Sequence, residues 1–236
     1  MTRYIQRHSF LTRFTHGVVA ITCIALAITG VFVFWPELGG SVMGGDFTHT
    51  MRMLHRVVAV PFILVPILAA LISPKGCLHM FRDDIFGKWD SDDVTWAMKF
   101  PFYLFMPSKV HMPPQHHVKS AQRLADGALV FFCIILGVTG VMLWLKTGMF
   151  GMTVDFDADT LLWARLLHDI FFVLTTIVGI AHIYLGAGIF EPYKGTARIM
   201  FGDGKVSESD ALYHWGYWAN EELTTGRNVT LEKDQK

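Results

Sequence analysis

The chain is poor in charge, and this shortage excludes several classes of protein. Only 17% of its 236 residues are charged, whereas an ordinary soluble domain carries about 25%. Lysine and arginine number 20, as do aspartate and glutamate, so no basic excess points to nucleic-acid binding. With 52% hydrophobic residues, the composition also excludes a disordered chain.

Cysteines are equally scarce. Cys23, Cys77 and Cys133 contain no C-x-x-C pair, which excludes an iron–sulfur cluster or a covalently attached c-type haem built from this chain. The sequence also lacks a nucleotide-binding fingerprint and a P-loop. We therefore assign no catalytic residues and expect the chain to work with partner subunits.

Long uncharged apolar runs dominate the sequence. A helix needs about 20 residues to cross a bilayer core of about 30 Å. The four runs of suitable length are Gly17–Trp35, Val57–Ser73 with Met53–Arg56 before it, Gly127–Leu145 and Ile170–Phe190. Each run is apolar around its whole circumference, which is typical of a lipid-facing span rather than of an amphipathic surface helix. The sequence therefore predicts an all-α integral membrane protein, a bundle of four transmembrane helices.

We predict a single membrane domain over residues 1–236. Its expected parts are helices at about 15–36, 53–73, 122–146 and 161–191, a loop at 74–121 and a tail at 192–236. Sixteen of the 20 lysines and arginines fall in the N-terminal arm, the connection Pro74–Arg123 and the tail. The positive-inside rule therefore places both termini in the cytoplasm, and the connections around Ser41–Thr50 and Gly148–Thr160 outside.

Four of the 11 histidines sit in or at the ends of the spans, where ionisable side chains are rare and usually functional. His16 and His182 lie toward the cytoplasmic side, and His55 and His168 toward the outer side. His168 and His182 are 14 residues apart, which separates them by about 21 Å on nearly the same helix face. Two depths with two neutral imidazoles each fit two six-coordinate b-type haems.

Two alternatives to haem remain open for these histidines. Zinc prefers four nitrogen, sulfur or oxygen ligands, and no carboxylate or thiol obviously joins either pair in the sequence. A histidine in a span can also form a hydrogen bond to a neighbouring helix without any metal. The second alternative would make the chain a haem-free membrane anchor or a four-helix transporter.

Residues near the two depths are further candidates. Arginines there are candidate partners for haem propionates, or alternatively anchors at the membrane surface; these are Arg13, Arg52, Arg56 and Arg165. His117, Lys119 and Gln122 precede the third span, and they are candidates for a quinone pocket because a quinone headgroup needs a hydrogen-bond donor and a proton source. The aromatic segment 90–114 indicates an interfacial segment on the cytoplasmic face, or a cover for the inner haem or a partner subunit.

Short motifs from Arg13 to about Trp218 occur in a distinctive order. They are Arg13–His16, Met53–His55, Leu166–His168, His182–Tyr184, Lys194-Gly195, Gly204–Ser207 and Trp215–Trp218. In this order they resemble the membrane cytochrome b (gamma) subunit of respiratory formate dehydrogenases, a di-haem b family. Gln122 fits the family's approach to the third helix, whereas Lys119 stands where a shorter amide is expected.

The resemblance implies a function. Electrons from an iron–sulfur subunit on the outer face would pass through two haems b to a menaquinone- or ubiquinone-type acceptor near the cytoplasmic face. His55 and His168 would hold the outer haem iron, and His16 and His182 the inner one. The chain would be the quinone-reacting subunit of a respiratory oxidoreductase complex in the bacterial inner membrane. A catalytic subunit containing molybdenum or tungsten would oxidise the primary substrate.

A second hypothesis for the function is closely related to the first. The cytochrome b of a hydrogenase, a thiosulfate reductase or another periplasmic oxidoreductase would need the same spans and the same histidines. The tail motifs favour formate dehydrogenase, but the placement of the histidines does not separate these complexes.

Overall fold

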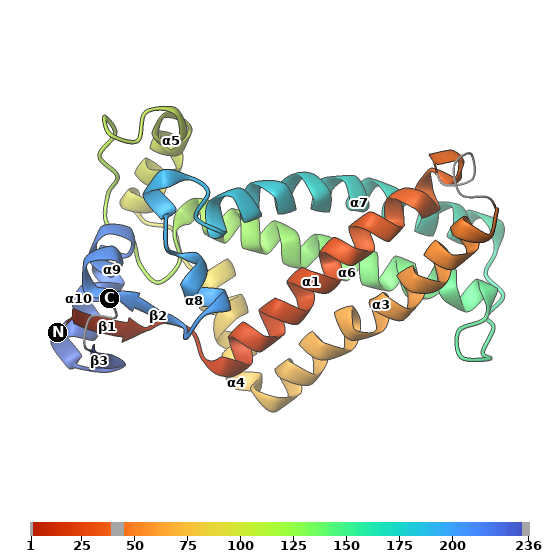
Figure 1. The fold of residues 1–236 in the computed structure, drawn as a ribbon, viewed down its shortest axis with the longest axis horizontal. Helices are drawn as coiled ribbons and strands as arrows, with labels where there is room; N and C mark the ends of the chain where they lie inside the picture. Colours follow the sequence, from red (N-terminus) through yellow and green to blue (C-terminus); the bar gives the residue numbers. More distant parts are fainter. Residues whose placement is uncertain (1, 39–44, 233–236) are drawn as a thin grey trace. The chain divides into compact units, whose positions relative to one another are not determined.

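Four long helices form the framework of the chain (Figure 1). The structure is a computed structural model that describes residues 2–38 and 45–232. The long helices are α1 (Phe10–Phe34), α3 (Gly45–Ile72), α6 (Ser120–Thr147) and α7 (Ala158–Gly186). All four are long and apolar enough to cross a membrane, so the prediction of an all-α four-helix membrane protein is confirmed. The predicted outer connection around Ser41–Thr50 lies partly outside the described residues.

The helices begin earlier than the uncharged runs suggest because polar residues cap them. Helix α1 begins after Ser9, whose Oγ accepts a hydrogen bond from the Thr12 backbone N–H at 3.2 Å. Helix α7 begins after Asp157, whose Oδ1 accepts one from the Thr160 N–H at 2.8 Å. Such caps satisfy the free N–H groups of a first turn. A search for charge-free runs therefore misses the polar first turn of each helix.

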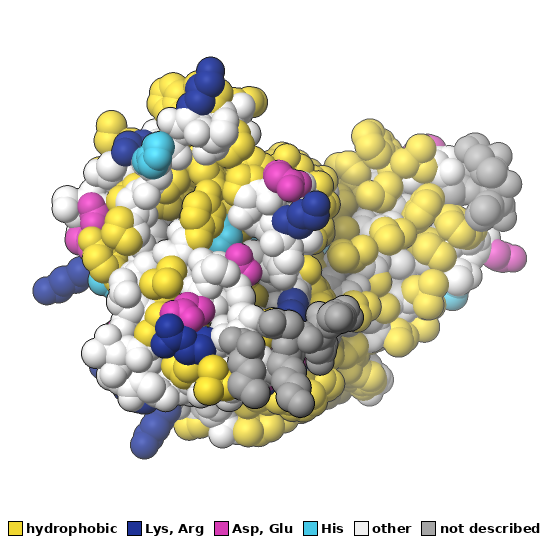
Figure 2. Space-filling view, turned by 60° about the vertical axis from the view of Figure 1, so that its left-hand side comes forward, with side chains coloured by type: hydrophobic (Ala, Val, Ile, Leu, Met, Phe, Trp, Pro, Cys, Tyr) yellow, Lys and Arg dark blue, Asp and Glu magenta, His cyan; other side chains and the backbone are white. Residues whose placement is uncertain are grey.

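Apolar side chains cover the outside of these helices. In an apolar stretch of 18 residues within each long helix, at most 11% of the residues are buried. Ile21, Leu71 and Ile177 are each more than half exposed, and Figure 2 shows mostly hydrophobic side chains on the visible surface of the long helices. An exposed apolar surface of this extent fits contact with lipid.

The chain divides into two compact units. One, which we call the membrane unit, contains residues 15–71 and 128–180. The other, which we call the terminal unit, contains residues 1–14, 72–127 and 181–236. The terminal unit thus gathers the N-terminal arm, the long loop and the tail, the three segments that the positive-inside rule assigns to one side of the membrane. The prediction that both units form a single domain stays a prediction.

A small sheet joins both ends of the chain in the terminal unit. Strand β1 (Thr2–Gln6) lies between β2 (Lys205–Ser207) and β3 (Val229–Glu232), and both pairings are antiparallel. Ile5 of β1 is fully buried and belongs to the core of this unit. The other buried members of this core are Ile199, Val206, Ala211, Trp215, Trp218 and Ala219. The sequence analysis did not anticipate the sheet, because its strands are short and its pairing partners lie at opposite ends of the chain.

Short helices complete the terminal unit. They are α4 (Pro74–His79), the π-helix η1 (Met80–Ile85), α5 (Ser91–Phe105), the 3-10 helix η2 (Glu191–Tyr193), α8 (Ala197–Phe201), α9 (Glu208–His214) and α10 (Gly216–Thr225). Helix α5 begins with a capping box between Asp90 and Asp93 and buries Trp96 and Tyr103 on one face. Its opposite face exposes the apolar side chains of Val94, Met98, Phe102 and Phe105. Helix α5 therefore has one buried and one exposed apolar face, and it lies within the aromatic segment 90–114 noted in the sequence.

A buried lysine joins the loop to the tail inside this unit. Lys119 is only 3% exposed, and its Nζ lies 2.9 Å from Nδ1 of His214 and 3.8 Å from the centre of the Tyr193 ring. Loss of hydration lowers the pKa of Lys119 well below its usual value. Burial, with the nearby lysine, lowers the pKa of His214 to about 2. His214 is therefore neutral in the folded protein.

Substitution of Ile5 tests the sheet. Replacing Ile5 by Ala removes a fully buried side chain from the core, and we expect a loss of about 2–5 kcal/mol in the stability of the terminal unit. Replacing Arg3 on the same strand by Ala is the control, because its ion pair with Glu208 is exposed and contributes at most about 1 kcal/mol. Thermal unfolding in detergent, followed by tryptophan fluorescence, measures both. Equal effects of the two substitutions would show that β1 is not part of the core.

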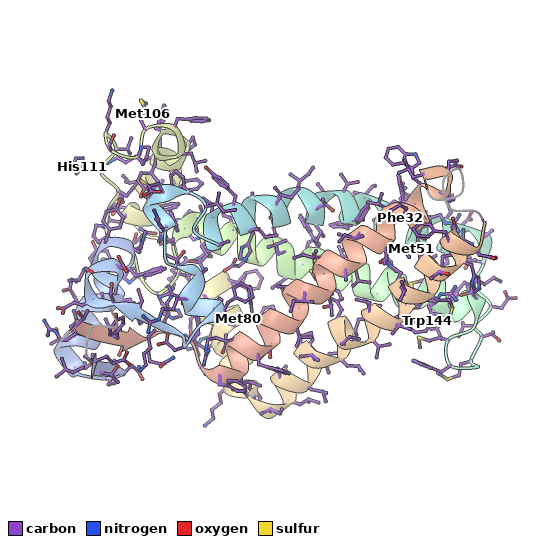
Figure 3. The ribbon with its side chains drawn as sticks, in the orientation of Figure 1. Phe32, Met51, Met80, Met106, His111 and Trp144 are labelled. Atoms are coloured by element: carbon purple, nitrogen blue, oxygen red, sulfur yellow. The ribbon has the colours of Figure 1, made fainter. Side chains whose placement is uncertain are left out.

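The neutral His214 predicts a dependence of stability on pH. Below pH about 6.5 the unfolded chain binds a proton on His214 that the buried ring does not bind, so stability falls as the pH falls. In a His214→Gln variant, the thermal midpoint should fall less between pH 8 and pH 5.5 than it does in the wild type. An exposed histidine in the loop after α5, His111, provides the control (Figure 3). A His111→Gln variant should keep the wild-type slope, and a His214→Gln variant that keeps it as well would contradict the prediction.

Candidate functional site

Two of the predicted histidines face each other within the membrane unit. His55 comes from α3 and His168 from α7. Their ring centroids lie 6.4 Å apart, with an angle of 70° between the ring planes. Both rings are half-buried. The structure therefore brings together the outer pair that the depth argument predicts.

A threonine hydroxyl orients each of these rings. Thr29 Oγ1 lies 2.9 Å from Nδ1 of His55, and Thr139 Oγ1 lies 2.9 Å from Nδ1 of His168. Each hydroxyl proton is donated to a backbone carbonyl one turn earlier, of Ala25 at 2.8 Å and of Ile135 at 2.7 Å. Because a hydroxyl has only one proton, its oxygen accepts from the imidazole Nδ1–H. The Nε2 lone pair of each ring is then free to bind a metal ion.

The two halves of this arrangement repeat in the sequence. Helix α6 repeats residues of α1 at a constant spacing: Arg13, Gly17, Cys23, Thr29 and Gly30 recur as Arg123, Gly127, Cys133, Thr139 and Gly140. Helix α7 likewise repeats α3: Arg52, Leu54 and His55 recur as Arg165, Leu167 and His168. The sequence analysis missed the two threonines, and this repeat, which pairs one threonine with one histidine in each copy, is the signal that identifies them.

The separation of the outer pair suits two histidines that would hold one haem iron. Their ring centroids lie 6.4 Å apart, so one metal ion between the rings could be reached by a nitrogen of each at bonds of about 2.0 Å. Glycine allows each ring to lie against the adjacent helix: a Cβ on Gly30 would be 3.5 Å from His55 Cε1, and a Cβ on Gly140 would be 3.2 Å from His168 Cε1.

A carboxylate accompanies the third predicted ligand. His182 lies on α7 in the terminal unit, and its Nδ1 is 3.5 Å from Oδ1 of Asp126 on α6. Gln122 donates from Nε2 to Oδ2 of the same aspartate at 3.2 Å. From the sequence, no carboxylate obviously joins either histidine pair. The repeat again gives the signal, because Asp126 occupies in α6 the position that His16 occupies in α1.

The fourth predicted ligand, His16, lies on α1 in the membrane unit, whereas His182 belongs to the terminal unit. Their pairing stays a prediction.

Several other candidate residues contact protein groups. Arg13 donates to the carbonyl of Gly202, and Arg56 donates to Thr147 Oγ1 at 2.8 Å. Both arginines therefore connect a membrane helix to another part of their own unit. Their predicted contacts with haem propionates stay predictions.

The three candidates for a quinone pocket are spread over the terminal unit. Gln122 belongs to the group around His182, as described above, and Lys119 is buried against His214 and Tyr193. His117 Nδ1 lies 3.2 Å from Oδ1 of Asp84, and burial lowers the pKa of this imidazole below its usual value. Of the three, Gln122 is connected through Asp126 to a predicted haem ligand, His182.

Comparisons with known proteins identify relatives of this chain. The nitrate-inducible formate dehydrogenase cytochrome b556(Fdn) subunits of Escherichia coli strains K12 and O157:H7 and of Shigella flexneri are each 22% identical to this chain over 221 residues. The alignment covers 93% of this chain and 92% of each relative. The family model described as prokaryotic cytochrome b561 matches residues 7–203. The chain therefore belongs to the prokaryotic cytochrome b561 family, whose members bind haem b and transfer electrons in membranes.

Proposed function

We propose that this chain carries electrons across the membrane through two b haems to a quinone, as the membrane subunit of a formate dehydrogenase-like complex. The outer haem would be held by His55 and His168, and the inner haem by His16 and His182. The carrying observation is the outer pair, in which two imidazoles from different helices face each other and each Nδ1 contacts a threonine hydroxyl. Haem b, when bound, supplies a centre that accepts and releases one electron.

The protein groups around the outer pair have two roles. Thr29 and Thr139 fix the tautomer of the histidines, and by accepting from Nδ1–H they increase the basicity of each ring. The surrounding helices are apolar on every side, so the site excludes bulk water and keeps the ligands neutral. Asp126 would orient His182 in the same way, through Nδ1.

The quinone would react near the inner haem. Gln122 can donate a hydrogen bond to a quinone carbonyl, and Asp126 connects it to His182. His117 is a candidate proton donor, because its imidazole has a carboxylate neighbour, Asp84. Lys119 would act differently: its contacts with His214 and Tyr193 hold the start of α6 in place.

The direction of transfer has an energetic consequence. An electron that enters outside and leaves on the negative cytoplasmic side moves against the membrane potential, at a cost of about 2.3 kcal/mol per 100 mV. Quinone reduction at the cytoplasmic side would consume protons there, while substrate oxidation by a partner outside would release them. Both termini belong to one sheet, which supports their placement on one side of the membrane.

The identity of the partner subunits distinguishes the remaining hypotheses about the complex. We propose an iron–sulfur subunit and a molybdenum- or tungsten-containing catalytic subunit as partners. Another periplasmic oxidoreductase, such as a hydrogenase or thiosulfate reductase, is the second candidate, because the outer histidine pair suits any of them. Purification of the complex from its native membrane, followed by mass spectrometry of the co-purifying subunits, distinguishes these complexes.

Loss of one histidine should remove one haem. The purified wild-type protein should contain two haems b per chain in a pyridine haemochrome assay, with b-type bands in the reduced-minus-oxidised spectrum. We expect His55→Ala and His168→Ala to lose the outer haem, and His16→Ala and His182→Ala to lose the inner one. His111→Ala, a substitution in an exposed loop, should keep both. A featureless wild-type spectrum, or a His182→Ala protein with both haems, would refute the assignment.

Loss of a threonine hydroxyl should change the potential of the outer haem without loss of the haem. In Thr139→Val the ring Nδ1–H of His168 loses its acceptor, so the ligand is less basic and the ferric state less stable. A hydrogen bond contributes about 0.5–1.5 kcal/mol, which corresponds to a rise of about 20–60 mV in a one-electron potential. Thr29→Val should act in the same direction through His55.

The matched control for these variants is Thr176→Val. Thr176 Oγ1 donates to the carbonyl of Phe172 at 2.8 Å, as Thr29 and Thr139 donate to theirs, and within the described part of the chain it has no hydrogen bond to a histidine. Spectroelectrochemical titration should therefore give the wild-type potentials for this variant. Unchanged potentials in both Thr29→Val and Thr139→Val would show that the threonines do not act on the ligands.

A further inference from the structure

A second group of metal-ligating side chains lies in the terminal unit, apart from the four predicted haem ligands. It contains His79 at the end of α4, Asp84 in η1 and His117 in the loop before α6. One ligand atom from each of the three residues lies within 4.8 Å of the others. We propose that these three residues bind one divalent transition-metal ion of the Zn²⁺ class. This inference does not rest on the proposed electron transfer.

The distances in the group are close to those of a zinc site. His117 Nδ1 lies 3.2 Å from Asp84 Oδ1, and His79 Nε2 lies 4.0 Å from the same oxygen. Zinc bonds of about 2.0–2.2 Å in a tetrahedron place neighbouring ligand atoms about 3.4 Å apart. The contact between His117 and Asp84 already has this length. The side chain of His79 is 60% exposed, so a small rotation can close the longer distance.

A neighbouring carboxylate orients the first histidine for metal binding. His79 Nδ1 lies 2.7 Å from Asp83 Oδ2, and Asp83 accepts two hydrogen bonds from Arg82 at 2.8 and 3.1 Å. Histidines that bind metals usually donate their other ring N–H to a carboxylate, which fixes the tautomer and increases the basicity of the ligand nitrogen. With Nδ1–H donated to Asp83, Nε2 of His79 presents its lone pair toward Asp84.

The π-helix η1 explains why two successive aspartates reach the same ring. Residues Met80–Ile85 form this helix directly after His79. Asp83 approaches one nitrogen of His79 and Asp84 the other, at 2.7 and 4.0 Å. Single π-helical turns within helices occur frequently at functional sites, because the wider turn redirects side chains. Here it places an orienting carboxylate and a ligand carboxylate on opposite sides of one imidazole.

The donor set selects the kind of ion. Two imidazoles and one carboxylate suit Zn²⁺ and similar transition metals, whereas Ca²⁺ and Mg²⁺ prefer oxygen ligands throughout. The three protein ligands leave a fourth tetrahedral position for water. A positive charge lies close by: Arg7 donates to the backbone carbonyl of His117, and Asp84 stabilises its charge. This charge weakens the electrostatic attraction of the site for a cation. Metal binding would therefore depend mainly on the direct bonds to the imidazole nitrogens.

Zinc binding to the purified, full-length, haem-containing protein tests the proposal. Isothermal titration with ZnCl₂, after treatment with a chelator, should show one saturable site per chain. His79→Gln and His117→Gln should each weaken the affinity at least tenfold. Asp83→Asn removes only the orienting carboxylate, and it should weaken binding about 10–100-fold. His111→Gln changes a histidine of the same unit that lies outside the group, and it should bind zinc like the wild type.

X-ray absorption at the zinc edge gives a second, structural measurement. It should show two imidazole ligands at about 2.0–2.1 Å in the wild type and fewer in His117→Gln. The haem spectrum and the thermal midpoint of each variant show whether it is folded. No saturable binding in the wild type, or equal affinity in wild type, His79→Gln and His117→Gln, would overturn the proposal. Because zinc is measured directly, a negative result leaves the haem assignment unaffected, and a loss of haems leaves the zinc result interpretable.

Discussion

The low polarity of a bilayer sets the main constraint on this structure, because an imidazole within it must have a partner for its N–H group. In the outer pair, threonine hydroxyls supply these partners, and both hydroxyls also satisfy a carbonyl of their own helix. Each histidine is thereby fixed in one tautomer and directed by its helix toward the other. A pair of imidazoles without Thr29 and Thr139 would be free to rotate and to change tautomer. The same two hydrogen bonds make the pair stable in a membrane and suitable as metal ligands.

The internal repeat explains why the outer and the inner levels differ. His55 and His168 occupy equivalent positions in the two copies, and so do the threonines that orient them. The inner level breaks this equivalence. His16 corresponds to Asp126 in the second copy, and His182 corresponds to Ala69 in the first. In the proposed inner site, one copy would thus contribute the ligand of its first helix, and the other copy the ligand of its second helix. The aspartate at the position equivalent to His16 lies beside His182, where it can orient that histidine.

Much of this arrangement could be predicted from the sequence, because the bilayer imposes simple rules. The four spans follow from uncharged length, and the outer histidine pair follows from depth and from the period of a helix. The sheet could not be predicted, since β1 pairs with strands from the other end of the chain. The buried position of Lys119 could not be predicted from the sequence either. A lysine before a span normally lies at the membrane surface, whereas here tertiary contacts with His214 and Tyr193 bury it. The threonines are visible in the sequence only when the repeat is recognised.

The terminal unit shows how polar groups are used where water is within reach. In the membrane unit Nδ1 of His55 and Nδ1 of His168 each have one short contact with a neutral threonine hydroxyl. In the terminal unit, basic side chains lie against aromatic rings: Arg7 over Trp215 at 3.9 Å, and Lys119 over Tyr193 at 3.8 Å. Such contacts stabilise a buried basic group, and for Arg7 the nearby carboxylate of Asp84 adds to this effect. Because these residues come from the N-terminal arm, the loop and the tail, the contacts also join three distant parts of the chain. A site for quinone, proton or metal chemistry in this unit would therefore rest on a scaffold built by cation–aromatic contacts, whereas the outer haem would rest on hydrogen bonds alone.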